Sequence, residues 1–168
     1  CTGITTIELP NNTEFTTIDC GTFSNCTSLK NITIPSSVAN IKSQDSSLGT
    51  GAFYKCYSLE SISIPNSVQS IGQYTFEKCT GLKHIKFSSR MSTIPSGAFD
   101  GCTSIEEIII PDYISSIGWG AFEDCTKLHT LTIGINVTSL SSQCFAGCSS
   151  LTQVYMKPIT PPSLPNGT

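Results

Sequence analysis

The segment FEDCTKLHTLTI, residues 122–133, places a cysteine three residues after a phenylalanine and three residues before a leucine. The chain has nine cysteines, and most of them stand in this same setting. A cysteine in such a context could be catalytic, metal-binding, disulfide-bonded or structural. The spacing of the residues around it decides between these roles.

The segment belongs to a unit that recurs every 23 residues. The unit reads F-x-x-C-x-x-L-x-x-I-x-I-P-x-x-V-x-x-I-G-x-x-A/T-F, and eight of its columns stay in register over five copies. An earlier copy starts at Phe23 and carries seven extra residues, which places an insertion near 42–52. Cys1, Ile4 and Ile7 fit the same columns, so we expect the chain to start in mid-repeat.

A repeat of this length with an L-x-x-I-x-I core predicts a leucine-rich-repeat solenoid, because one coil cannot bury its own apolar face and stacked coils bury a continuous one. The alternating I-x-I segment predicts one short strand per coil, and the stacked strands form a parallel sheet on the concave face. The convex segments are too short for long helices, so we expect extended or 3₁₀ structure there. The expected fold is of the α/β-horseshoe class but mostly β. It has about seven coils over residues 1–157 and a proline-rich terminal segment at 158–168.

These residues also carry a family resemblance. Over residues 1–156 the unit resembles the BspA-like, or treponemal-type, leucine-rich repeat, and the ending VYMKPITPPSL (154–164) is similar to the segment that closes many bacterial arrays. The resemblance implies a secreted or cell-surface protein whose partner is a protein of the host matrix or of another cell. Two alternatives stay open: a structural spacer that presents another domain, and a noncatalytic recognition module attached to an enzyme.

Composition narrows the function classes. Charged residues make up only 12% of the chain, below the roughly 25% of an ordinary soluble domain, and Ser and Thr fill 46 of 168 positions. A net charge of −3 argues against a nucleic-acid partner, which requires clustered cations. No apolar run approaches the roughly 18–20 residues of a membrane span. Catalytic motifs are absent, so we expect neither enzymatic activity nor a cofactor.

The periodicity also bears on the cysteines. One cysteine per coil forms a line, whereas zinc needs four converging ligands. Disulfides between neighbouring coils are the rival interpretation, but parallel Cβ atoms about 4.8 Å apart lie beyond the preferred separation of about 3.5–4.5 Å. We therefore expect free, buried thiols that act as small apolar residues. These structural cysteines are Cys26, Cys56, Cys79, Cys102, Cys125 and Cys148.

The outward positions of the sheet are the candidate binding surface. An exposed apolar Ile109 and an aromatic Tyr155 among polar neighbours are typical of a protein-binding patch. The competing interpretation is that alternating charges simply keep the sheet soluble. A metal site is disfavoured because its potential ligands occupy different columns and coils. Trp119 and Tyr74 mark a second candidate surface in the bend. The tentative partner-binding residues on the concave face are His84, Lys86, Glu106, Glu107, Ile109, His129, Thr132 and Tyr155.

Overall fold

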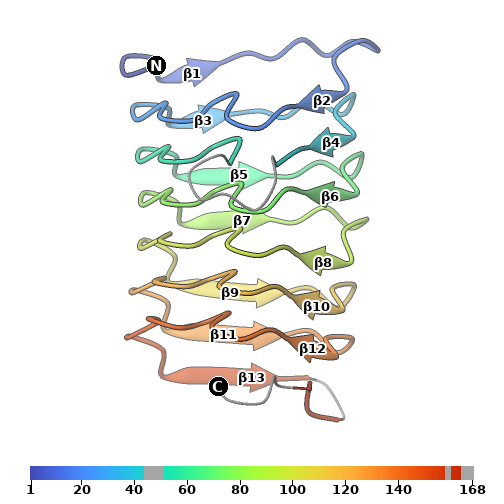
Figure 1. The fold of residues 1–168 in the computed structure, drawn as a ribbon, viewed down its shortest axis with the longest axis vertical. Helices are drawn as coiled ribbons and strands as arrows, with labels where there is room; N and C mark the ends of the chain where they lie inside the picture. The colour runs from blue at the N-terminus through green and yellow to red at the C-terminus, as the bar shows by residue number, and fades with distance from the viewer. Residues whose placement is uncertain (44–50, 158–159, 164–168) are drawn as a thin grey trace.

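The computed structural model describes residues 1–43, 51–157 and 160–163. The chain winds into a stack of coils, and each coil passes through two short strands on opposite sides of the stack (Figure 1). We call the side formed by the I-x-I segments, which the sequence pattern assigned to the concave face, the first face. Its strands are β1 (Thr6–Ile7), β3 (Asn31–Ile32), β5 (Ser61–Ser63), β7 (His84–Lys86), β9 (Glu107–Ile110), β11 (Thr130–Ile133) and β13 (Gln153–Met156). The second face consists of β2 (Thr17–Ile18), β4 (Asn40–Ile41), β6 (Ser70–Ile71), β8 (Thr93–Ile94), β10 (Ser116–Ile117) and β12 (Ser139–Leu140).

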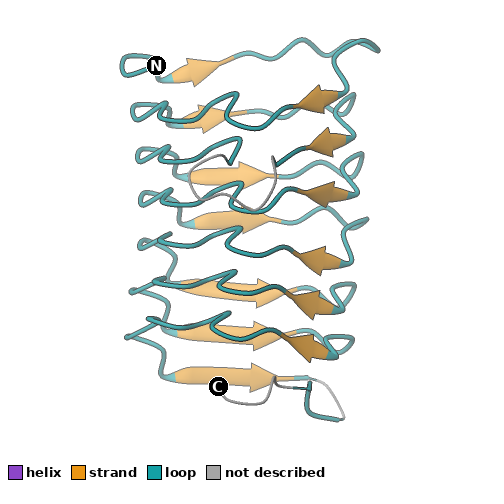
Figure 2. Cartoon of the chain, in the orientation of Figure 1, coloured by secondary structure: helices purple, strands orange, loops and turns teal. Residues whose placement is uncertain are grey.

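The predicted solenoid of parallel strands is confirmed, with one adjustment to the coil count. In the described residues seven strands lie on the first face and six on the second, so these residues form about six turns followed by a seventh first-face strand. The second side has extended structure, which was one of the two expected possibilities, the other being 3₁₀-helix. Neither α-helix nor 3₁₀-helix occurs in the described part of the chain (Figure 2). Accordingly, the described residues contain no helix that could span a bilayer.

Two segments singled out by the sequence lie partly outside the described residues. Within the expected insertion near 42–52, residues 44–50 are not described. The same holds for residues 158–159 and 164–168 of the proline-rich terminal segment.

The strand register repeats the period of the sequence. Thr130 of β11 pairs with Glu107 of β9 and with Gln153 of β13, which are each 23 residues away. Along β9 the side chains alternate between exposed and buried, so that Ile108 and Ile110 enter the core. A period-2 strand with one buried face specifies this register strongly, because a slip of one residue would expose both isoleucines.

A column of phenylalanines forms the spine of the stack at the turn that leads into the first face. Successive rings from Phe23 to Phe145 stack with centroids 5.0 to 5.5 Å apart. The backbone is paired here too; the Phe76 N–H, for example, donates to the Ala98 carbonyl at 2.9 Å. The residue before each cysteine has a left-handed backbone, with φ between +55° and +70°. These residues are Asn25, Lys55, Lys78, Gly101, Asp124 and Gly147.

This turn directs each cysteine thiol at the coil before it. The Cys102 thiol donates to the Phe76 carbonyl at 3.2 Å, and the same bond recurs from Cys56, Cys79, Cys125 and Cys148 to the phenylalanine carbonyls at 23, 53, 99 and 122. Burial raises the pKa of the Cys102 thiol far above its usual range. All nine cysteines are free in the structure; Cys148 is only partly buried, whereas the other five predicted structural cysteines are buried.

The sheets of both faces are interrupted at the coil that contains β7 and β8, whereas the missing ladder between β3 and β5 affects the first face alone. β7 pairs with β5 but not with β9, and β8 pairs with β10 but not with β6. Figure 1 shows the wider separation of β7 from β9 than of β9 from β11. This coil carries Phe87 where most coils have isoleucine, Met91 in a valine or isoleucine column, and Ser88 where most coils have proline. The Phe87 ring stands edge-on to Phe99 at 5.8 Å, so a bulkier core accompanies the interruption.

Four acidic side chains influence one another near the phenylalanine turns, and one of them, Glu77, is buried. Partial burial, together with the carboxylates of Glu77, Glu123 and Asp124, raises the pKa of Asp100 to about 6, and Lys78 offsets this in part. The folded state therefore holds the Asp100 proton more tightly than the unfolded chain does. The resulting stabilisation is present at low pH and is lost as the pH rises through about 6.

The thiol contact predicts a stability effect for Cys102→Ala. The substitution removes a buried sulfur and one of the two donors to the Phe76 carbonyl, which keeps only the Cys79 N–H. We therefore expect the free energy of unfolding to fall by about 1–2 kcal/mol. Urea denaturation would measure this, with Cys20→Ala, at a partly exposed cysteine, as the control that changes stability by less than about 0.5 kcal/mol. Equal stability of Cys102→Ala and wild type would contradict a structural role for the thiol.

The carboxylate cluster predicts that Asp100→Asn stabilises the protein at pH 7.5 by about 1 kcal/mol and has little effect at pH 4. Thermal unfolding at both pH values would measure the difference. Asp112→Asn is the control, and we expect it to destabilise the protein at pH 7.5. The pKa of Asp112 is lowered, first by the hydrogen bond from the Ile135 N–H and then by Lys157. A gain from Asp100→Asn that is equal at both pH values would show that the carboxylate charge is not its cause.

Candidate functional site

The first face of the solenoid presents two outward columns of side chains. On β9 these are Glu107 and Ile109, both exposed, and on β7 they are His84 and Lys86, also exposed. Because the period is 23 residues, His84 precedes Glu107 in one column and Lys86 precedes Ile109 in the other. The polar and apolar groups of neighbouring coils are thereby placed on the same surface.

The later coils carry an apolar row across this face. Ile109 is 63% exposed and pairs in register with Thr132, which in turn pairs with Tyr155, itself 56% exposed. The apolar side chain, the threonine and the aromatic ring thus follow one another on β9, β11 and β13. Of the predicted partner-binding residues, these three form one continuous row.

A polar network runs beside the apolar row. The His129 ring nitrogen Nδ1 lies 2.9 Å from the Thr130 hydroxyl, which donates to Gln153 Oε1 at 3.3 Å. His129 and Thr130 are half-buried. These bonds link the outward side chains of β11 and β13, and they leave the apolar row uncovered.

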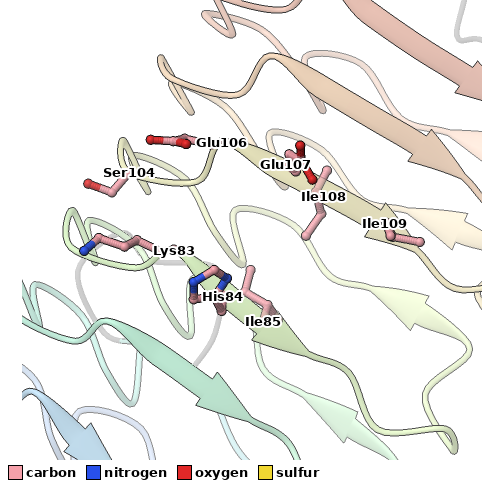
Figure 3. A pocket seen from close by; sticks show the side chains of 8 residues that line it. All are labelled: Lys83, His84, Ile85, Ser104, Glu106, Glu107, Ile108 and Ile109. Atoms are coloured by element: carbon pink, nitrogen blue, oxygen red, sulfur yellow. The ribbon is translucent and has the colours of Figure 1, made fainter.

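The interruption between β7 and β9 opens a cleft of about 420 Å³ in the first face (Figure 3). One wall comes from the β7 coil and the other from the β9 coil, as the labelled side chains show. The cleft is lined by Lys83, His84, Ile85, Ser104, Glu106, Glu107, Ile108 and Ile109.

The cleft brings together four of the eight predicted residues, namely His84, Glu106, Glu107 and Ile109. Lys86, His129, Thr132 and Tyr155 lie on the same face but outside it. Sequence reasoning missed the cleft itself and its remaining lining residues, because the strand patterns of β7 and β9 look regular. The available signal was the pair of bulky substitutions at Phe87 and Met91, which mark this coil as different.

The floor of the cleft exposes part of the core. Ile85 is only half-buried, whereas its column neighbours Ile62 and Ile108 are buried. Cross-coil charge pairing also stops here: Lys83 contacts Glu60 at 3.8 Å on the β5 side, but no ion pair joins Lys83 to Glu106 in the described part of the chain. The basic residues Lys83 and His84 lie on the β7 wall of the cleft, and the acidic residues Glu106 and Glu107 lie on the β9 wall (Figure 3).

The other candidate sites are less supported. Within the described ranges, no three His, Cys, Asp or Glu side chains cluster as a metal site would require. The assignment of Tyr74 to a second surface is wrong, because its ring is buried over Gly97, where there is no room for a Cβ atom. Trp119 remains 40% exposed in the bend.

Several solved structures of bacterial leucine-rich-repeat proteins are similar to this chain. A leucine-rich cell surface protein of Faecalibacterium prausnitzii is 29% identical with a TM-score of 0.68, over 92% of this chain and 48% of that protein. A leucine-rich-repeat protein of Treponema pallidum is 27% identical with a TM-score of 0.54, over 70% of this chain and 63% of that one. A third, from Eubacterium ventriosum, is 26% identical with a TM-score of 0.65, over 80% of this chain and 39% of that one.

This chain thus spans less than two thirds of the length of each of these three proteins. A search of curated proteins gave no match. The family description that matches is the BspA-type leucine-rich-repeat region, with six copies over residues 1–45 and 46–161. Together with the 23-residue coils and the parallel strands, this match shows that the chain belongs to the BspA-type leucine-rich-repeat family.

Proposed function

We propose that this chain is a non-enzymatic protein-binding module of a secreted or cell-surface protein, and that it adheres to host matrix or to other cells through its first face. The observation that carries the proposal is the row formed by Ile109, Thr132 and Tyr155 beside the cleft. Exposed apolar and aromatic groups on a rigid sheet lose little conformational entropy on binding, which favours them as anchors of an interface.

The polar surroundings of the row support the same conclusion. His84, Lys86, Glu106 and Glu107 place polar side chains beside the exposed Ile109 on β7 and at the start of β9. An apolar centre with a polar rim is the usual anatomy of a protein–protein interface. The similar cell surface protein of Faecalibacterium prausnitzii supports the proposed location, because it shares the fold over nearly all of this chain.

The row predicts that Ile109→Glu and Tyr155→Ala each weaken binding to a partner about tenfold or more, as expected of a buried anchor residue. The measurement is surface plasmon resonance of the purified chain over a panel of immobilised matrix proteins and mucins. Ile135→Glu is the matched control, because Ile135 is also exposed, at 47%, but lies beyond the end of β11.

Three outcomes separate the alternatives. Loss of binding in Ile109→Glu and Tyr155→Ala but not in Ile135→Glu supports the first face. Equal binding by all three variants and wild type would mean that the binding site lies elsewhere on the solenoid. Absence of binding to every protein on the panel would contradict adhesion and favour a spacer that presents another domain.

A further inference from the structure

The first-face sheet is broken between β3 and β5 and between β7 and β9, and the second break leaves two strand edges facing each other across the cleft. In a parallel sheet, the N–H and C=O groups of alternate residues point to opposite sides of the strand. The Thr130 N–H donates to the Glu106 carbonyl at 3.3 Å, which shows that the backbone of Glu106 faces β11. By this alternation, the backbone groups of Glu107 and Ile109 face β7.

The edge of β7 is oriented in the complementary way. The His84 N–H donates to the Glu60 carbonyl at 3.3 Å, and the Lys86 carbonyl accepts from the Ile64 N–H at 2.9 Å, so these two residues face β5. The backbone of Ile85 therefore faces β9. No ladder joins β7 to β9 in the described part of the chain, and the edge groups of both strands are left for another partner.

Contacts on both sides of the cleft join the β7 coil to the β9 coil. At one side the Phe76 and Phe99 rings stack at 5.4 Å, and the Phe76 N–H is bonded to the Ala98 carbonyl. Beyond the end of β7, the Tyr113 hydroxyl donates to the Phe87 carbonyl at 3.2 Å. The Phe87 ring meanwhile fills the core edge-on to Phe99.

From these edges we infer that the cleft binds an extended segment of a partner protein, which adds as a strand to the free edge of β9. Alternating donors and acceptors at strand spacing match a polypeptide backbone. The half-buried Ile85 would contact apolar side chains on the inner side of the segment, while Lys83 and Glu106 on opposite walls would meet polar side chains on its outer side. The inference rests on the proposed protein-binding function and specifies how the partner is held.

The test uses the whole chain and the acetylated peptide KLHTLTIG, which has the sequence of residues 127–134 and therefore of a strand that already pairs with β9. Hydrogen exchange by NMR compares neighbouring amides of one strand. In the free protein we expect the amides of Glu107 and Ile109 to exchange quickly and that of Ile108, which faces β11, to exchange slowly. Millimolar peptide should slow the exchange of Glu107 and Ile109 without altering that of Ile108.

Two matched controls isolate backbone pairing from side-chain contacts. A peptide of the same sequence with N-methyl groups on alternate residues keeps its side chains but loses donors, and it should bind about tenfold more weakly. Glu107→Pro and Glu107→Ala both remove the carboxylate, but only proline also removes the edge N–H, which β11 does not use. We expect Glu107→Pro to bind the peptide about tenfold more weakly than Glu107→Ala.

Several results would overturn the inference. Slow exchange of Glu107 and Ile109 in the free protein would mean that the edge is already paired. Equal binding of the N-methylated peptide, or no effect of the peptide at millimolar concentration, would exclude strand addition. Protection that grows with protein concentration alone would identify a second copy of the chain as the occupant. If strand addition fails while Ile109→Glu still abolishes capture by a matrix protein, the proposed function stands without it.

Discussion

Stacking of coils at the phenylalanine turn is the constraint on which the rest of the structure depends. Each turn joins its neighbour through a ring stack, a backbone hydrogen bond and, in most coils, a thiol that donates to a phenylalanine carbonyl. These contacts continue through the coil where the sheets on both faces are interrupted. The spine therefore holds the two halves of the solenoid together and lets the faces separate without breaking the core.

That division between spine and faces explains how a regular repeat acquires a specific site. A perfectly periodic solenoid would present the same paired backbone at every coil, and its side chains alone would distinguish one part of the face from another. The coil with Phe87 and Met91 departs from the period in its core, and the first face opens at β7 and β9. The resulting cleft adds free backbone groups to a surface on which Ile109 is already exposed.

The outward residues could be predicted from the sequence because strand alternation is local. Ile109 had to face solvent once Ile108 and Ile110 were assigned to the core, and the structure exposes it. Alternation does not distinguish Tyr155 in the same way, because its neighbours Val154 and Met156 are exposed as well. The cleft could not be predicted in this way. Its opening depends on how bulky core side chains fit between two coils. The repeat pattern records only that these positions are apolar and gives neither the volume nor the orientation of the side chains. The burial of Tyr74 over Gly97 was missed for the same reason, since the left-handed glycine has no signature in the hydrophobic period.

The sequence by itself determined the solenoid, its strand register and the assignment of one cysteine to each coil, because these follow from a 23-residue period in which every coil must bury its apolar face against the next. Only the tertiary structure decided where the thiols donate, which strands stay unpaired and which half of the predicted surface residues meet around one cleft. Those features depend on the volumes and orientations of side chains in adjacent coils. Packing in three dimensions determines them, and periodicity along the chain does not.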